Sequence, residues 1–70
     1  MSGPMTILLN GEARDIGSGS TLLDLLRTLG LDPAAVVVEL NRNIVRKPAI
    51  ADTPLHDGDQ VELVHFVRGG

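Results

Sequence analysis

The sequence from Leu55 to Gly70 reads LHDGDQVELVHFVRGG and joins a tight turn to a strand that ends in two glycines. In the turn, Asp57 can accept a hydrogen bond from its own backbone, and Gly58 tolerates a positive φ. A strand is predicted over Gln60–Val67, because valine, leucine and phenylalanine fill much of this run directly after the turn. The turn and strand together predict a β-strand that leads directly into a short glycine tail.

Alternation along this strand divides its side chains between two faces of a sheet. The two sets are Val61, Leu63, His65 and Val67 on one face, and Glu62, Val64 and Phe66 on the other. We expect the first set to face the core. The second set would then form an exposed partner-docking surface, in which Val64 and Phe66 lie beside Glu62. The alternative reverses the faces and places Phe66 in the core.

The glycine pair Gly69-Gly70 carries the α-carboxylate at the end of this sequence. Neither glycine has a Cβ, so the tail can enter a narrow slot where any side chain would clash. A carboxylate placed there can be chemically activated. The tail therefore suggests a C-terminus that is itself a substrate; the alternative is a trimmed linker.

The first hairpin is predicted from a strand at 6–9, the pair Asn10-Gly11 and a returning strand at 12–16. Both residues of a type I′ turn need positive φ, which Asn-Gly readily supplies. We expect Ala13 and Ile16 to be the buried residues of the returning strand.

A helix is predicted next. Thr21 and Asp24 have the spacing of a capping box, with Ser20 as the alternative cap. Gly30 supplies a stop signal. Four leucines recur at helical spacing and predict one buried stripe: Leu22, Leu25, Leu26 and Leu29.

The remaining elements follow in order: a short helical turn from Asp32-Pro33, a strand at 36–40, a turn and brief strand at 41–45, and a loop with a tight helical turn at 50–55. The order β-β-α-β-β predicts one α+β domain over residues 1–70. Its fold would be a roll in which one main helix covers a mixed sheet of about four to five strands, with the first and last strands adjacent. Residues 1–4 are a candidate disordered end, and residues 67–70 a flexible tail.

Composition excludes several classes of protein. Six Lys and Arg against nine Asp and Glu, with one Phe and no Trp or Tyr, disfavour a nucleic-acid binder. The absence of cysteine excludes disulfides, thiolate nucleophiles, thiolate metal sites and side-chain persulfides. The apolar runs are too short to cross a membrane, so we expect a cytoplasmic protein without a membrane partner.

Other candidate sites have simpler interpretations. His56 with Asp57 and Asp59 lacks the loop length of a calcium site and the cysteines of a structural zinc site. The segment 17–19, Gly-Ser-Gly, lacks the lysine and spacing of a phosphate-binding loop, so a connector is favoured. His65 has no partner nucleophile. We therefore expect a protein with no catalytic residues, no metal and no bound cofactor.

The turn at 55–59, the ending VHFVRGG at 64–70, Asn10-Gly11 and the segment VELN at 38–41 together resemble a known family. They are similar to the ubiquitin-like β-grasp sulfur carriers, and most closely to the ThiS family of thiamine biosynthesis. The resemblance extends over nearly the whole sequence from Met5. It departs at residues 46–50, where many members have a Pro-Arg pair and then a Trp, and at Arg68, where small residues are common.

The resemblance implies a carrier that partner enzymes act upon. An E1-like adenylyltransferase of the ThiF type would consume ATP to adenylate the Gly70 carboxylate, and the tail of Arg68, Gly69 and Gly70 would enter its active site. A sulfur donor such as a cysteine desulfurase would supply sulfur for a thiocarboxylate on Gly70. A thiazole synthase of the ThiG type would accept that sulfur into the thiazole ring.

Three alternatives stay open at this point. A related carrier could feed molybdopterin assembly or tRNA thiolation. A ubiquitin-like modifier would form an isopeptide with lysine. A TGS-like binding module shares the β-grasp body but needs no Gly-Gly end.

Overall fold

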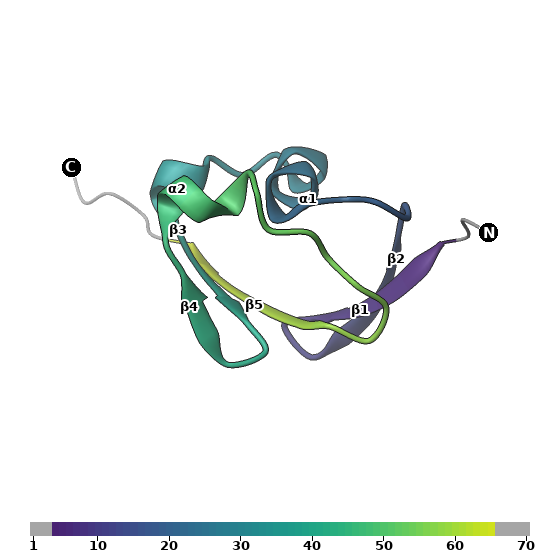
Figure 1. Ribbon diagram of the computed structural model, residues 1–70. Coiled ribbons are helices and arrows are strands. Elements are labelled where there is room, and N and C mark those ends of the chain that lie inside the picture. The colour runs from purple at the N-terminus through teal and green to yellow at the C-terminus, as the bar shows by residue number, and fades with distance from the viewer. Residues whose placement is uncertain (1–3, 66–70) are drawn as a thin grey trace.

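The computed structural model describes residues 4–65 of the 70-residue chain. A curved sheet carries helix α1 on its concave side (Figure 1). The elements in chain order are β1 (Met5–Leu9), β2 (Glu12–Ile16), α1 (Leu22–Leu29), the 3-10 turn η1 (Pro33–Ala35), β3 (Val36–Leu40), β4 (Asn43–Val45), α2 (Lys47–Ile50) and β5 (Gln60–His65). The predicted mixed sheet with one main helix is confirmed.

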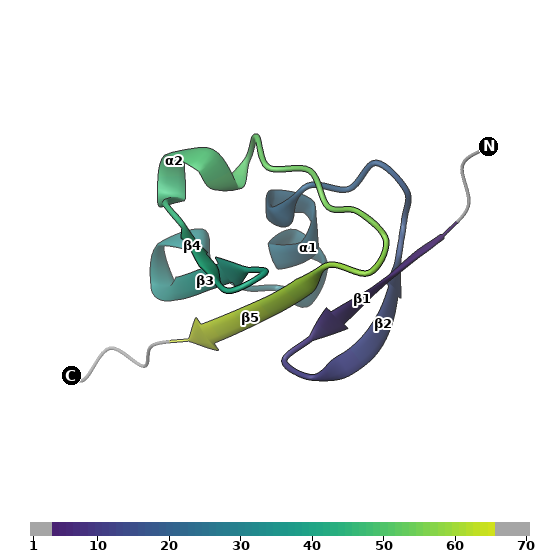
Figure 2. The same cartoon turned by 60° about the horizontal axis from the view of Figure 1, so that its bottom comes forward.

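The strands of the described residues form one five-stranded sheet in the order β2-β1-β5-β3-β4. β1 and β5 pair in parallel, and the other pairs are antiparallel. The first and last strands are therefore adjacent, as predicted. Figure 2 shows β5 running between the β1–β2 and β3–β4 hairpins, so the last strand joins two otherwise separate halves of the sheet.

Helix α1 begins at the predicted capping box. The Thr21 hydroxyl accepts from the Asp24 backbone N–H at 3.2 Å, and the Asp24 carboxylate accepts from the Thr21 N–H at 2.9 Å. The Ser20 hydroxyl instead donates to the Gly17 carbonyl, so Ser20 is not the cap. The helix ends at Gly30, whose φ of 72° is in the left-handed region that glycine commonly adopts at the C-terminal end of a helix.

The core lies between α1 and the concave face of the sheet. Its fully buried members are Ile7, Leu22, Leu25, Leu26, Val36, Val38, Ile50, Leu55 and Val61. Leu29 is partly buried against this cluster, so the predicted leucine stripe is confirmed. Within residues 4–65, no helix has the length and apolar character needed to cross a membrane.

Ala13 departs from the prediction, because it is exposed rather than buried. It pairs directly with Leu8 of β1, and both side chains point away from α1. Ile16, which is half-buried, lies three positions further along β2. Since faces alternate with every residue, two positions three apart in a regular strand cannot share one face.

Two smaller expectations were also wrong. Asp57 does not bond its own backbone: its carboxylate accepts from the N–H of Thr6 at 2.9 Å. The tight helical turn lies at Lys47–Ile50, earlier than the predicted 50–55, because Pro48 occupies the first turn of the helix, where proline is well tolerated.

Candidate functional site

The predicted tail residues and one docking residue, namely Phe66, Arg68, Gly69 and Gly70, lie outside the described residues. The structure does describe β5, the strand that leads to them. The period-two division of this strand is confirmed over residues 61–64: Val61 is fully buried, Leu63 is half-buried, and Glu62 and Val64 are exposed. His65, which we assigned to the core face, is exposed at the end of the strand.

Asn10 in the β1–β2 turn holds β5 from one side. Its backbone N–H donates to the carbonyl of Val61 at 2.9 Å. Its side-chain Oδ1 accepts from the N–H of Leu63 at 2.8 Å, and its Nδ2 donates to the Leu63 carbonyl at 3.4 Å. The side chain thus continues the hydrogen bonding of β5 past the point where β1 ends.

Asn41 in the β3–β4 turn holds the start of β5 from the other side. Its N–H donates to the carbonyl of Gln60 at 2.7 Å, and its Oδ1 accepts from the Gln60 N–H at 2.9 Å. Its Nδ2 donates to the Asp59 carboxylate at 3.1 Å. Asn10 and Asn41 have φ values of 49° and 51°, a conformation that asparagine tolerates better than most residues.

Neither clamp was predicted, although both asparagines were assigned to turns. An asparagine at a turn position was the sequence feature that could have indicated each clamp, because one side-chain amide can both donate to and accept from a neighbouring strand. The clamps hold Asp59 and the first part of β5, upstream of the predicted tail.

The turn before β5 is held by its own carboxylates. Asp57 accepts from Thr6, as described above, and the Asp59 carboxylate accepts from the His56 backbone N–H at 2.8 Å. The same Asp59 oxygen lies 3.9 Å from the His56 Nδ1. In the part of the chain that the structure describes, no group of three or more potential metal ligands gathers. The two aspartates act as backbone acceptors that shape the turn.

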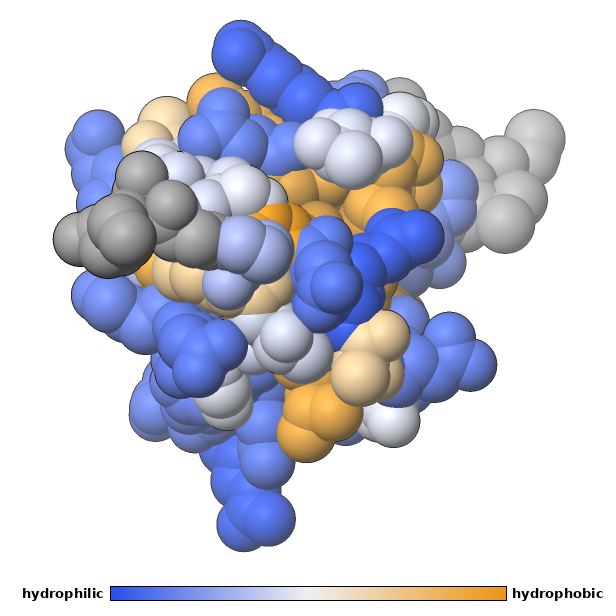
Figure 3. Space-filling model, turned by 90° about the vertical axis from the view of Figure 1, so that its right-hand side faces the viewer, coloured by the Kyte–Doolittle hydropathy of each residue, from blue (hydrophilic) through white to orange (hydrophobic). Residues whose placement is uncertain are grey.

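The sheet face opposite α1 carries the exposed large apolar side chains of the described residues. Val64 is 56% exposed, Ile44 69% and Leu8 39%. Leu8 and Ile44 come from other strands, and their place on this face was not predicted. Alternation along β1 and β4 indicates which side chains share a face, but it assigns them to the face of Val64 only once the strand order is known. By contrast, the surface at the β1–β2 end of the molecule is largely hydrophilic, with apolar residues in small patches (Figure 3).

Comparison with known proteins gives consistent matches. The model of the ThiS family matches residues 7–70. The thiazole synthase of Paramagnetospirillum magneticum is 41% identical over 66 residues, which are 94% of this chain and 20% of that protein. The chain thus spans about a fifth of the length of that relative.

Shorter relatives match over nearly their whole length. The sulfur carrier protein ThiS of Thermus thermophilus is 39% identical over 64 residues, covering 91% of this chain and 98% of that protein. The crystal structure of the thiamine biosynthesis protein ThiS from Geobacter metallireducens superposes with a TM-score of 0.80 at 30% identity, covering 94% of this chain and 100% of that one. The sequence match and the shared fold together show that the chain belongs to the ThiS family.

Proposed function

We propose that the protein is a sulfur carrier of thiamine biosynthesis, and that its Gly70 carboxylate becomes a thiocarboxylate. The observation that carries this proposal is the family match, which runs through residue 70 and so includes the glycine pair. Family membership favours the thiamine pathway over a carrier for molybdopterin or tRNA thiolation, a protein modifier and a TGS-like module.

The chemistry starts from a carboxylate, which is a poor acyl donor because its leaving group would be oxide. In the proposed route, an E1-like enzyme of the ThiF type transfers AMP from ATP to the Gly70 carboxylate and releases pyrophosphate. Sulfide from a donor then attacks the acyl carbon and displaces AMP, which leaves the thiocarboxylate. If the donor is a protein persulfide, a second thiol cleaves the acyl disulfide that forms.

The described body supports a carrier role. β5 is the middle strand of the sheet, and Asn10 and Asn41 hold it from both sides. This anchoring would fix the end of the body from which residues 66–70 continue. The chain contains no cysteine, so the transferred sulfur has no side chain here on which to reside.

The proposed partners follow the same sequence of reactions. A cysteine desulfurase would supply the sulfur, and a thiazole synthase of the ThiG type would receive it. Similarity of this chain to a region of proteins named thiazole synthase supports the second partner. ATP is consumed by the adenylyltransferase; the carrier contributes the acyl group and the docking surface of Glu62, Val64 and Phe66.

The test is the intact mass of the protein after incubation with ATP, the E1-like adenylyltransferase of the same cell and a sulfur donor. We expect a gain equal to the replacement of one oxygen by one sulfur, localised to Gly70. The matched control lacks Gly70 and should gain nothing. An unchanged mass for the parent protein, with the enzyme active on a known carrier, would refute the proposal.

A further inference from the structure

A shallow depression lies on the sheet face opposite α1, between the β1–β2 turn and β5. It has a volume of about 180 Å³ and is lined by Leu8, Gly11, Gln60, Val61 and Glu62. Leu8 and Gln60 are direct neighbours across the parallel β1–β5 pair. The depression therefore has an apolar side chain at one wall and a carboxylate at another.

The carboxylate of Glu62 belongs to a pair of like charges. Glu39 of β3 is directly opposite Glu62 in the antiparallel β3–β5 ladder. Directly opposed residues share one face, with Cα atoms about 4.5–5.5 Å apart. Like charges in this arrangement destabilise a sheet, so the pair is unfavourable in the isolated protein.

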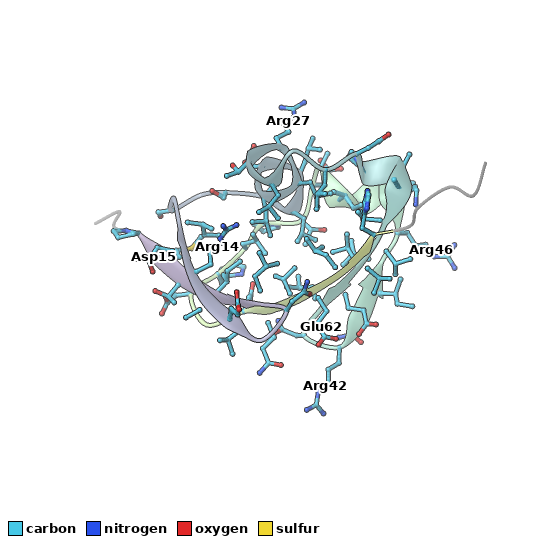
Figure 4. The ribbon with its side chains drawn as sticks, turned by 180° about the vertical axis from the view of Figure 1, so that it is seen from behind. Arg14, Asp15, Arg27, Arg42, Arg46 and Glu62 are labelled. Carbon is cyan, nitrogen blue, oxygen red and sulfur yellow. The ribbon has the colours of Figure 1, made fainter. Side chains whose placement is uncertain are left out.

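Neighbouring cations do not neutralise the pair within residues 4–65, where neither carboxylate forms an ion pair with Lys or Arg. Arg42 in the β3–β4 turn projects from the same side of the sheet as Glu62, whereas Arg27 of α1 projects from the other side of the molecule (Figure 4). The next positions toward the end of β5 are apolar, because Val37 is directly opposite the exposed Val64. Glu62 thus lies at the depression, with Glu39 directly opposite it and the apolar pair of Val37 and Val64 further along the strands.

We propose that this face receives an arginine side chain of the adenylating partner. The aliphatic stem would lie in the depression against Leu8, and the guanidinium would bind Glu62 with Glu39 beside it. The inference rests on the proposed function and specifies the chemistry of its docking partner.

Arginine fits this surface better than other cations. Its methylene stem packs on apolar surface while the charged group reaches polar atoms at the edge. Its planar group donates two parallel hydrogen bonds to a carboxylate, and it is less strongly hydrated than the lysine ammonium. A nucleic acid is disfavoured, because the net charge of −3 would repel phosphates.

The proposal is tested by ATP–pyrophosphate exchange, catalysed by the E1-like adenylyltransferase of the same cell and measured against carrier concentration. Glu62→Gln should raise KM on the order of tenfold with kcat retained, because the tail chemistry is untouched. Glu39→Gln should also raise KM. The control is Glu12→Gln, an exposed glutamate of β2 that does not line the depression, and it should leave KM unchanged.

Two further readouts sharpen the test. Added salt should raise the KM of the parent protein more than that of Glu62→Gln, because screening weakens an attraction that the variant lacks. Glu62→Gln should also melt at a higher temperature than the parent, which separates weaker docking from misfolding.

The outcomes separate the two proposals. An unchanged KM for both Glu62→Gln and Glu39→Gln, or an equal change for Glu12→Gln, would overturn the arginine site and leave the carrier function intact. A parent protein that supports no exchange would overturn both. Self-association through this face, lost in Val64→Asp, would identify the occupant as a second copy and also overturn the arginine site.

Discussion

Asn10 accepts the backbone N–H of Leu63 through its side chain at 2.8 Å, across 53 positions of sequence. The bond joins the first hairpin to the strand that leads to the glycine tail. Asn10 forms this bond with a φ of 49°, so one residue meets the conformational requirement of the turn and the bonding requirement of the clamp.

Replacing Asn10 separates these two requirements. Asn10→Gly keeps the positive φ and removes only the amide, which should cost about 1 kcal/mol in free energy of unfolding. Asn10→Ala should cost about 1–2 kcal/mol more, because alanine is strained in the left-handed region. Urea denaturation gives both values. Hydrogen exchange at Leu63 should accelerate in both variants; unchanged protection there would show that the clamp does not form in solution.

The capping box of α1 predicts a local loss of stability. Thr21→Ala removes the side-chain acceptor for the Asp24 N–H and should lower the free energy of unfolding by about 1 kcal/mol. Thr28→Ala, on the exposed side of the same helix, is the matched control and should be neutral or slightly stabilising. Thermal unfolding of the two variants in parallel provides the measurement. Equal losses would indicate that the cap contributes nothing specific.

Two neighbouring strands test the assignment of faces. Ile7 is 0% exposed in the core, so Ile7→Ala should cost about 2–5 kcal/mol. Ala13 is exposed on the opposite face, and Ala13→Ser should change stability by less than about 0.5 kcal/mol. Denaturant midpoints distinguish the two. A large loss for Ala13→Ser would mean that the returning strand buries this residue after all.

The opposed glutamates predict a gain in stability. Glu62→Gln should stabilise the isolated protein by about 0.2–1 kcal/mol, because it removes a like charge directly across from Glu39. The gain should shrink in high salt, where the repulsion is already screened. Thermal unfolding at low and high ionic strength measures both effects. A variant less stable than the parent at low salt would contradict the prediction.

The tail predicts a loss of reaction without a loss of folding. Deleting Gly70, or adding one residue after it, should abolish adenylation, because the carboxylate would no longer reach the same position in the partner's slot. Far-ultraviolet circular dichroism and melting temperature should match the parent. Normal ATP–pyrophosphate exchange with either variant would refute the assignment of Gly70 as the acceptor.

Features with local causes were predictable from the sequence. The Asn10-Gly11 turn, the capping box at Thr21 and the stop at Gly30 each depend on residues within a few positions of one another. The alternation of β5 was equally clear, and it correctly separated buried Val61 from exposed Val64.

Features that depend on the exact register or full order of distant strands were not predictable. The acceptor role of Asp57 required knowing that Thr6 lies beside it, 51 positions away. Leu8 and Ile44 share a face with Val64 only because the strand order places β1 and β3–β4 on either side of β5. The opposition of Glu39 and Glu62 needed the exact register of two strands.

The central place of β5 has a consequence for biosynthesis. Until residues 60–65 have been made, the β1–β2 and β3–β4 hairpins share no strand and the sheet has no middle. Domains generally fold as units, so a chain interrupted before this strand cannot reach the native state. Completion of the fold and emergence of the glycine tail are therefore nearly simultaneous events. A chain truncated before β5 would lack both the middle strand of the sheet and the glycine pair.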